Sequence, residues 1–115
     1  MARITIKKYV TDWEKLYTFF EFVPGAGWEQ FEPLCSIFTD HLGYKVEGDL
    51  EGIWERYCTL RKGDFVFQLM LHDDFGTCLR NPEKQDEDYY VKLEQLANEV
   101  AEGISTNRYG LQKKD

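Results

Sequence analysis

The residues best suited to chemistry are His72, Asp73 and Asp74, which follow one another in the chain. A carboxylate beside an imidazole favours its charged form, so such a histidine can exchange protons near neutral pH. No nucleophile, second histidine or oxyanion site stands at a recognisable spacing from this group, and adjacency in sequence does not supply the geometry that catalysis requires. We therefore predict no catalytic residues. A small enzyme that uses His72 with Asp73 or Asp74 is kept as an alternative.

Residues that could hold a metal or a cofactor are sparse. The three cysteines, Cys35, Cys58 and Cys78, are widely spaced and form no Cys-x-x-Cys pair, so the sequence indicates neither a disulfide framework nor a zinc site. His41 and His72 are the only histidines. We expect reduced thiols, no metal and no cofactor.

The overall charge restricts the partners. The chain has 115 residues and a net charge of −7, with 21 acidic against 14 basic side chains. This balance argues against direct binding to nucleic acid, where lysine and arginine supply most of the affinity, and against an anionic membrane surface. No apolar run approaches the length of a membrane span. We expect a cytoplasmic protein and, if it has a partner, a basic protein.

The strongest structural pattern is a hairpin over residues 53–74, in which apolar and polar side chains alternate. A two-residue turn at Lys62-Gly63 places Leu60 opposite Phe65 and fixes the pairs that follow. One side of this ribbon is then apolar apart from a single arginine.

That arginine, Arg56, has two interpretations. It either contacts the acidic surface described below, or it is buried and needs a hydrogen-bonded acidic partner. Glu14 and Glu94 are the candidate partners.

The remaining patterns complete an α+β fold. Thr11 and Glu14 have the spacing of a capping box, which predicts a helix in front of Pro24. The predicted elements are a strand over 2–9, a helix over 11–23, a helix from about 32 to 43, a strand over 44–46, the hairpin, a strand over 77–79, and a helix from Asn81 to Gly103. We expect an antiparallel sheet of about five strands in the order β-α-α-β-β-β-β-α, covered on one face by helices. Residues 1–104 form a single domain, and residues 105–115 form a flexible tail.

Acidic residues are predicted to gather at one end of this sheet. Successive loops of a meander alternate between its ends, so the connector 47–52 and the turn 73–76 lie together, opposite Lys62-Gly63. Glu99 and Glu102 of the last helix are expected there too. We define the acidic rim as the predicted partner-binding set Glu47, Asp49, Glu51, Trp54, Tyr57, His72, Asp73 and Asp74. The charges have a second interpretation, with equal weight, as a solvated edge that discourages aggregation between sheets.

In its size, acidity, aromatic content and lack of a catalytic constellation, the chain resembles small immunity proteins that neutralise bacterial toxins, often by covering a basic nuclease site. The resemblance implies a tight, electrostatically steered complex made by Asp49, Glu51, Asp73, Asp74 and nearby aromatic residues. A second possibility within the same charge logic is a nucleic-acid mimic that occupies the groove of a DNA-binding protein. A mimic requires acids spaced along an extended surface like phosphates, whereas an immunity protein requires one compact patch.

Overall fold

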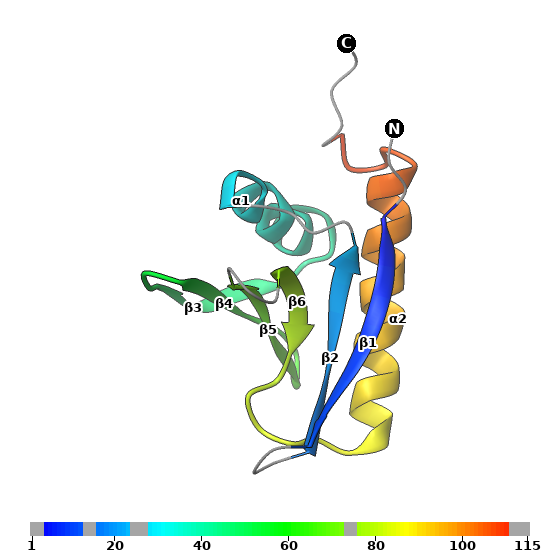
Figure 1. Cartoon of the computed structure of the whole chain (residues 1–115). Helices are drawn as coiled ribbons and strands as arrows, with labels where there is room; N and C mark the ends of the chain where they lie inside the picture. Colours follow the sequence, from blue (N-terminus) through cyan, green and yellow to red (C-terminus); the bar gives the residue numbers. More distant parts are fainter. Residues whose placement is uncertain (1–3, 13–15, 24–27, 73–75, 111–115) are drawn as a thin grey trace.

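The chain folds into one antiparallel sheet with two helices (Figure 1). The computed structural model describes residues 4–12, 16–23, 28–72 and 76–110. The elements are β1 (Thr5–Asp12), β2 (Leu16–Val23), α1 (Trp28–Ser36), the π-helical turn η1 (Ile37–His41), β3 (Lys45–Glu51), β4 (Glu55–Lys62), β5 (Phe65–His72), β6 (Gly76–Arg80) and α2 (Glu87–Ser105). The predicted α+β class is confirmed, but the described sheet has six strands rather than about five.

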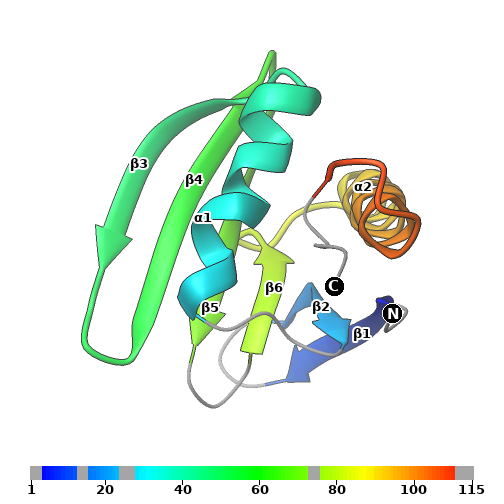
Figure 2. The ribbon, with the colours of Figure 1, turned by 90° about the horizontal axis from the view of Figure 1, so that it is seen from above.

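The sheet has the strand order β1-β2-β6-β5-β4-β3. The register places Phe20, Leu79, Leu69 and Cys58 in one row across four strands, and all four are buried. They belong to the same hydrophobic core as the buried residues of both helices. Helix α2 packs on β1, β2 and β6, while α1 lies over the other half of the sheet (Figure 2).

The predicted helix over 11–23 is wrong, because this region contains β2. Every second side chain is buried, namely Thr18, Phe20 and Phe22, whereas Phe19 between them is partly exposed. This period of two is that of a strand. The aromatic residues that widened the supposed helical stripe instead occupy the two faces of a strand that pairs with β1 on one side and β6 on the other. Glu14 of the supposed capping box lies outside the described residues.

Helix α1 begins at Trp28, ahead of the predicted start at Glu32, and contains Pro33 within it. A proline inside a helix removes one backbone hydrogen bond. The helix continues as the π-helical turn η1, which buries Ile37 and Phe38 in the core. Gly43 follows with a φ of 79°, the left-handed conformation predicted for it.

The predicted hairpin is present with its register shifted by two residues. Leu60 pairs with Phe67 and Lys62 with Phe65, so the turn is Gly63-Asp64 rather than Lys62-Gly63. A shift of two leaves every side chain on its predicted face. The apolar face is accordingly the buried one, as Cys58, Leu60, Phe67, Leu69 and Leu71 show.

Strand β3 corrects the predicted short strand and acidic connector. It extends from Lys45 to Glu51, so most of the supposed connector is part of the sheet. It pairs with β4 through a register shift between Val46 and Gly48. This irregularity places Glu47 outside the regular alternation of the strand.

Helix α2 differs from the prediction at both ends. Its N-cap is Asp86, whose side chain accepts a hydrogen bond from the Tyr89 amide at 2.8 Å, and not Asn81. The helix runs through Gly103 to Ser105. A Cβ at Gly103 would lie 2.2 Å from the ring of Tyr109, so a residue without a side chain is needed there for close packing rather than to end the helix.

The end of α2 is tied to other parts of the fold. Ser105 Oγ accepts a hydrogen bond from the Ile4 amide at 2.8 Å, next to the start of β1. Residues 106–110 form hydrogen-bonded turns, and the Tyr109 ring lies 5.1 Å from that of His41. Residues 111–115 of the predicted tail lie outside the described part of the chain.

Candidate partner-binding surface

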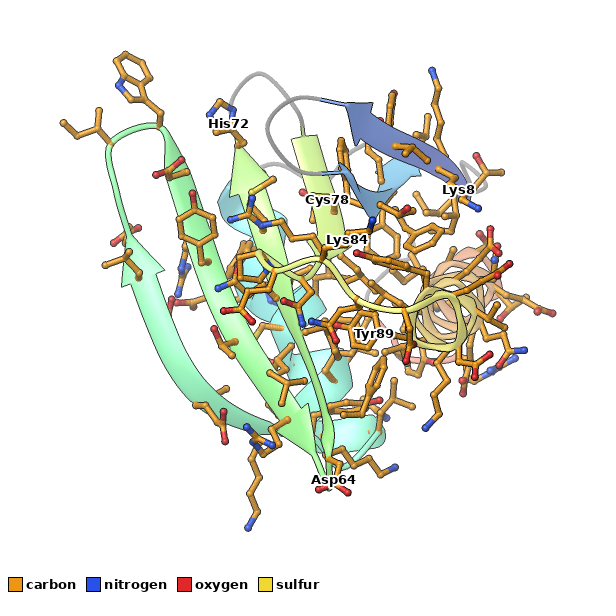
Figure 3. All side chains as sticks on the ribbon, turned by 90° about the horizontal axis from the view of Figure 1, so that it is seen from below. Lys8, Asp64, His72, Cys78, Lys84 and Tyr89 are labelled. Atoms are coloured by element: carbon orange, nitrogen blue, oxygen red, sulfur yellow. The ribbon has the colours of Figure 1, made fainter. Side chains whose placement is uncertain are left out.

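The surface most open to a partner is the ribbon formed by β3 and β4. Strand β3 is the last strand of the described sheet, and it is exposed at every residue. The chain turns after it through Gly52, whose amide donates to the Glu55 carbonyl at 2.7 Å. In Figure 3 this turn lies at the same end of the sheet as His72, and Asp64 lies at the opposite end. The Gly52 turn thus lies at the predicted end, but Glu47 of the supposed connector pairs with Arg61 and lies toward the opposite end, because the connector is part of strand β3.

Large apolar side chains stand exposed at this turn. Leu50, Ile53 and Trp54 have exposed fractions of 64%, 83% and 65%. Single exposed apolar residues are common on protein surfaces, but three within five positions at one turn are an unusual concentration. We call Leu50, Glu51, Ile53 and Trp54 the hairpin tip.

The acids of the predicted rim are not equivalent. Asp49 accepts two hydrogen bonds from Arg56 of β4, and Glu47 is paired with Arg61 of the same strand. Glu51 lies at the tip, opposite Arg56 in the strand register. The rim acids on β3 are thus distributed along an edge strand, and two of them are already neutralised by arginines.

Arg56 reaches acids other than the two predicted partners. Its guanidinium lies 3.1 Å from Asp49, 3.3 Å from Glu32 of α1, and 4.6 Å from the centre of the Phe31 ring. The hydrogen bonding from Arg56 to Asp49 is the largest of the effects that raise the pKa of Arg56. Glu94 belongs to α2, which packs on the other half of the sheet, and Glu14 lies outside the described residues. Both earlier interpretations of Arg56 therefore hold in part, since it contacts a rim acid and is largely buried.

Tyr57 and His72 lie near the tip, on the face of the sheet opposite Cys58, and Glu55 interacts with both of them. Glu55 pairs with His72 in the register, and its carboxylate lies 3.9 Å from the imidazole. Burial, and then a hydrogen bond to Glu55, raise the pKa of Tyr57. Arg80 stacks over the Tyr57 ring at 5.0 Å. Glu55 was missed by the sequence analysis, although its position opposite His72 would have followed from a correct hairpin register.

The remaining acids that were predicted at this end of the sheet fall into two groups. Asp73 and Asp74 lie outside the described residues, so the sequence-adjacent acids of His72 enter no geometric argument. Glu99 lines a cleft of about 380 Å³ beside Lys62, at the other end of the hairpin. Glu102 lies beside Ile4, next to the opposite edge strand. The expected convergence of α2 acids on the rim is therefore wrong, because α2 covers the half of the sheet away from β3.

The cleft beside Lys62 is the described hollow with the most varied chemistry. Its lining combines two lysines, two aromatic rings and one acid: Tyr44, Lys62, Phe65, Lys92, Gln95, Leu96 and Glu99. The ammonium groups already lie over aromatic rings, Lys62 over Tyr44 at 5.6 Å and Lys92 over Phe65 at 5.5 Å. His72 is not part of this lining, so the cleft provides no substrate pocket for the His72 alternative.

Within the described ranges, no three His, Cys, Asp or Glu side chains are grouped so that they could hold a metal ion. None of the described helices is long and apolar enough to cross a membrane. No family model matches the chain, and no curated protein or solved structure matches it either. The functional argument therefore rests on the chemistry of the surface.

Proposed function

We propose that this protein is a non-catalytic binding domain of the immunity type, which neutralises a basic partner protein such as a nuclease toxin by docking the hairpin tip against it. The observation that carries the proposal is the exposure of Leu50, Ile53 and Trp54 beside Glu51 on an uncovered edge strand. Tryptophan and other large apolar residues dominate binding energy at interface centres, where they become desolvated. A cytoplasmic location, where a nuclease would act, forms part of the proposal.

The charges favour a basic partner over a second copy of the chain. If β3 paired antiparallel with β3 of another copy around Asp49, the Asp49 side chains would meet and Glu47 would face Glu51. Like charges placed directly opposite each other destabilise such pairing. A positively charged surface meets no such penalty, and the net charge of −7 would speed its approach.

The proposed docking site is smaller than the predicted rim, because two of the rim acids are already paired with arginines. Because Glu47 and Asp49 are held by Arg61 and Arg56, displacing those arginines would offset much of any gain from new contacts. We therefore assign the close contacts to the tip and only the long-range attraction to the net charge. The same internal pairing disfavours the nucleic-acid mimic, which would need a continuous row of unpaired acids.

The test is capture of a partner from the native host with matched baits. One bait is the wild-type chain, the second carries Ile53→Ser and Trp54→Ala, and the third carries Val10→Ser on the opposite edge strand, where Val10 is 61% exposed. We expect the wild-type and Val10→Ser baits to retain the same basic protein and the tip variant to lose it. Truncation at an interface hot spot weakens binding by roughly tenfold or more.

Two further measurements distinguish docking from neutralisation. The association rate should fall by roughly tenfold between about 0.05 M and about 0.5 M salt if charge steers the encounter. The purified chain should also abolish the activity of the captured partner, and the tip variant should not. Equal capture by all three baits would refute the tip as the docking site, and capture without inhibition would refute neutralisation.

A further inference from the structure

Two cysteines that are far apart in sequence meet between α1 and the sheet. Cys35 lies in the last turn of α1 and Cys58 lies in the middle of β4, and their Sγ atoms are 3.0 Å apart. This separation is about 1 Å longer than a disulfide bond of roughly 2.05 Å. Side-chain rotation within the existing packing would therefore bring the sulfurs to bonding distance.

The two thiols have different surroundings. Cys58 is buried, whereas Cys35 is partly exposed. The hydrogen bond to Cys58 lowers the pKa of Cys35; Arg56 acts in the same direction, while burial, Asp49 and Glu32 oppose it. The same hydrogen bond, together with burial, raises the pKa of Cys58. The directions of these shifts agree with the difference in exposure, so Cys35 is the thiol that ionises more readily.

We propose that Cys35 and Cys58 form an oxidisable dithiol, in which a peroxide oxidises Cys35 and Cys58 then closes a reversible disulfide between α1 and β4. This site is independent of the proposed partner-binding function. The division of roles follows from access, because Cys35 is the partly exposed residue of the pair and Cys58 is buried beside it.

The chemistry balances with hydrogen peroxide as the oxidant. The Cys35 thiolate attacks one peroxide oxygen, and the O–O bond breaks. Hydroxide departs as the leaving group, and Cys35 becomes a sulfenic acid. Cys58 then attacks the Cys35 sulfur, the S–O bond breaks, and the departing hydroxyl takes the Cys58 proton as water. The two sulfurs lose two electrons in total, and the peroxide gains them. A dithiol reductant reverses the process by exchange.

The third cysteine provides an internal control. Cys78 lies on β6 next to Leu79, and Leu79 is in the same row across the sheet as Cys58. Because neighbouring residues of a strand point to opposite faces, Cys78 lies on the face of the sheet opposite Cys58. Burial raises the pKa of Cys78 to about 12. Cys78 should remain a thiol under conditions that oxidise the pair.

The experiment begins with the folded, reduced wild-type chain, treated with hydrogen peroxide and then alkylated under denaturing, non-reducing conditions. We expect two of the three thiols to disappear with the loss of two hydrogens in mass, and a dithiol reductant to restore them. Peptide mapping should recover one cross-linked species that joins the Cys35 and Cys58 peptides. Before oxidation, Cys35 should react with iodoacetamide roughly tenfold faster than Cys78 in the native protein.

Variants assign the individual roles. On treatment with peroxide, the Cys78→Ser variant should lose both of its remaining thiols, because Cys35 and Cys58 still form the disulfide. Cys58→Ser and Cys58→Ala should stop at a sulfenic acid on Cys35, which dimedone traps. Because a buried substitution can unfold the chain, only variants with the wild-type circular dichroism spectrum are compared, and the wild-type peptide map stands without them.

Three outcomes would overturn the proposal. The first is a wild-type chain that keeps all three thiols. The second is a disulfide that includes Cys78 or joins two chains. The third is a folded Cys58 variant that yields no dimedone adduct at Cys35, which would remove Cys35 as the attacking thiol.

Discussion

The two helices cover different halves of one sheet, and they are held to it by different kinds of contact. Helix α2 packs on β1, β2 and β6 with an apolar stripe of Leu93, Ala97, Val100 and Ala101, all buried. Helix α1 also buries apolar residues, but it contacts β4 through polar groups as well. Arg56 of β4 lies against Phe31 and Glu32, and the sulfur of Cys58 lies against that of Cys35. The α2 half is therefore a conventional apolar layer, whereas the α1 half combines packing with reactive and charged groups.

The two edge strands differ in the same way. In β1, next to α2, residues such as Ile6 alternate with exposed ones and pack against the core. In β3 every residue is exposed, and its Asp49 pairs with Arg56 of β4, which in turn pairs with Glu32 of α1. The comparison teaches that both halves share one hydrophobic core, while the α1 half ends in an edge strand that is exposed along its whole length.

The largest contrast between the halves should come from truncating one apolar residue in each. Leu93→Ala removes a fully buried side chain of α2 and should lower the free energy of unfolding by about 2–5 kcal/mol. Leu50→Ala on β3 should change it by less than about 0.5 kcal/mol, because that side chain is already in water. Urea titrations of both variants measure the difference. Similar losses in the two variants would contradict the exposed position of Leu50 on β3.

A smaller effect is expected from Arg56, which links β4 to β3 and α1. Arg56→Ala should cost about 1–2 kcal/mol, chiefly through lost packing and the contact with the Phe31 ring. The ion pairs add little, since Glu32 and Asp49 are 77% and 46% exposed. Arg61→Ala, which removes an exposed ion pair and a long hydrogen bond to the Gly63 carbonyl, should cost less than about 0.5 kcal/mol and is the matched control.

Arg56→Met separates packing from charge in the same urea titrations. The methionine keeps much of the apolar stem, so the variant should recover most of the stability lost in Arg56→Ala. A methionine variant as unstable as the alanine variant would show instead that the charge of Arg56 fastens the α1 half.

The smallest predicted effect concerns Tyr89, which connects the halves. Its hydroxyl, at the start of α2, donates to the Val66 carbonyl of β5, and burial raises its pKa to about 12. The unfolded state loses this proton near pH 10, while the folded state retains it up to about pH 12. The Tyr89 contribution to stability is therefore complete below about pH 10 and is lost as the pH rises toward 12. Because the side chain is partly exposed, we expect only about 1 kcal/mol.

Tyr89→Phe isolates this contribution, since all other titrating groups are common to both proteins. The stability difference between wild type and variant, measured by urea titration at several pH values, should shrink across that interval. A difference that stays constant with pH would show that folding does not raise the pKa of Tyr89. Ring packing alone would then link the two halves.

The sequence predicted well wherever one local pattern had only one structural solution. The hairpin faces were correct despite a register error of two residues, because alternation fixes the face and tolerates an even shift. The long apolar period of α2 likewise predicted a helix, although its caps were misplaced. At β2 the aromatic run satisfied both a helical and a strand period, and pairing with β1 and β6 decided between them.

The candidate surface was predicted in part. The sequence indicated that Trp54, Tyr57 and His72 would lie near one end of the hairpin, and the register brings Glu55 to the same place. It did not indicate that Arg56 and Arg61 would neutralise Asp49 and Glu47, since an ion pair depends on which strands are neighbours. It did not indicate the exposure of Leu50 and Ile53 either, because Leu50 was placed in a connector and its exposure depends on β3 being an uncovered edge strand.

By itself, then, the sequence determined the α+β class, the apolar face of the hairpin and the net charge of −7. These follow from composition and from patterns within a few residues. The tertiary structure alone decided that β3 is an uncovered edge, which acids remain unpaired, and that Cys35 meets Cys58. Each of those properties depends on side chains brought together from distant segments by burial of the shared core, and such contacts leave no periodic trace along the chain.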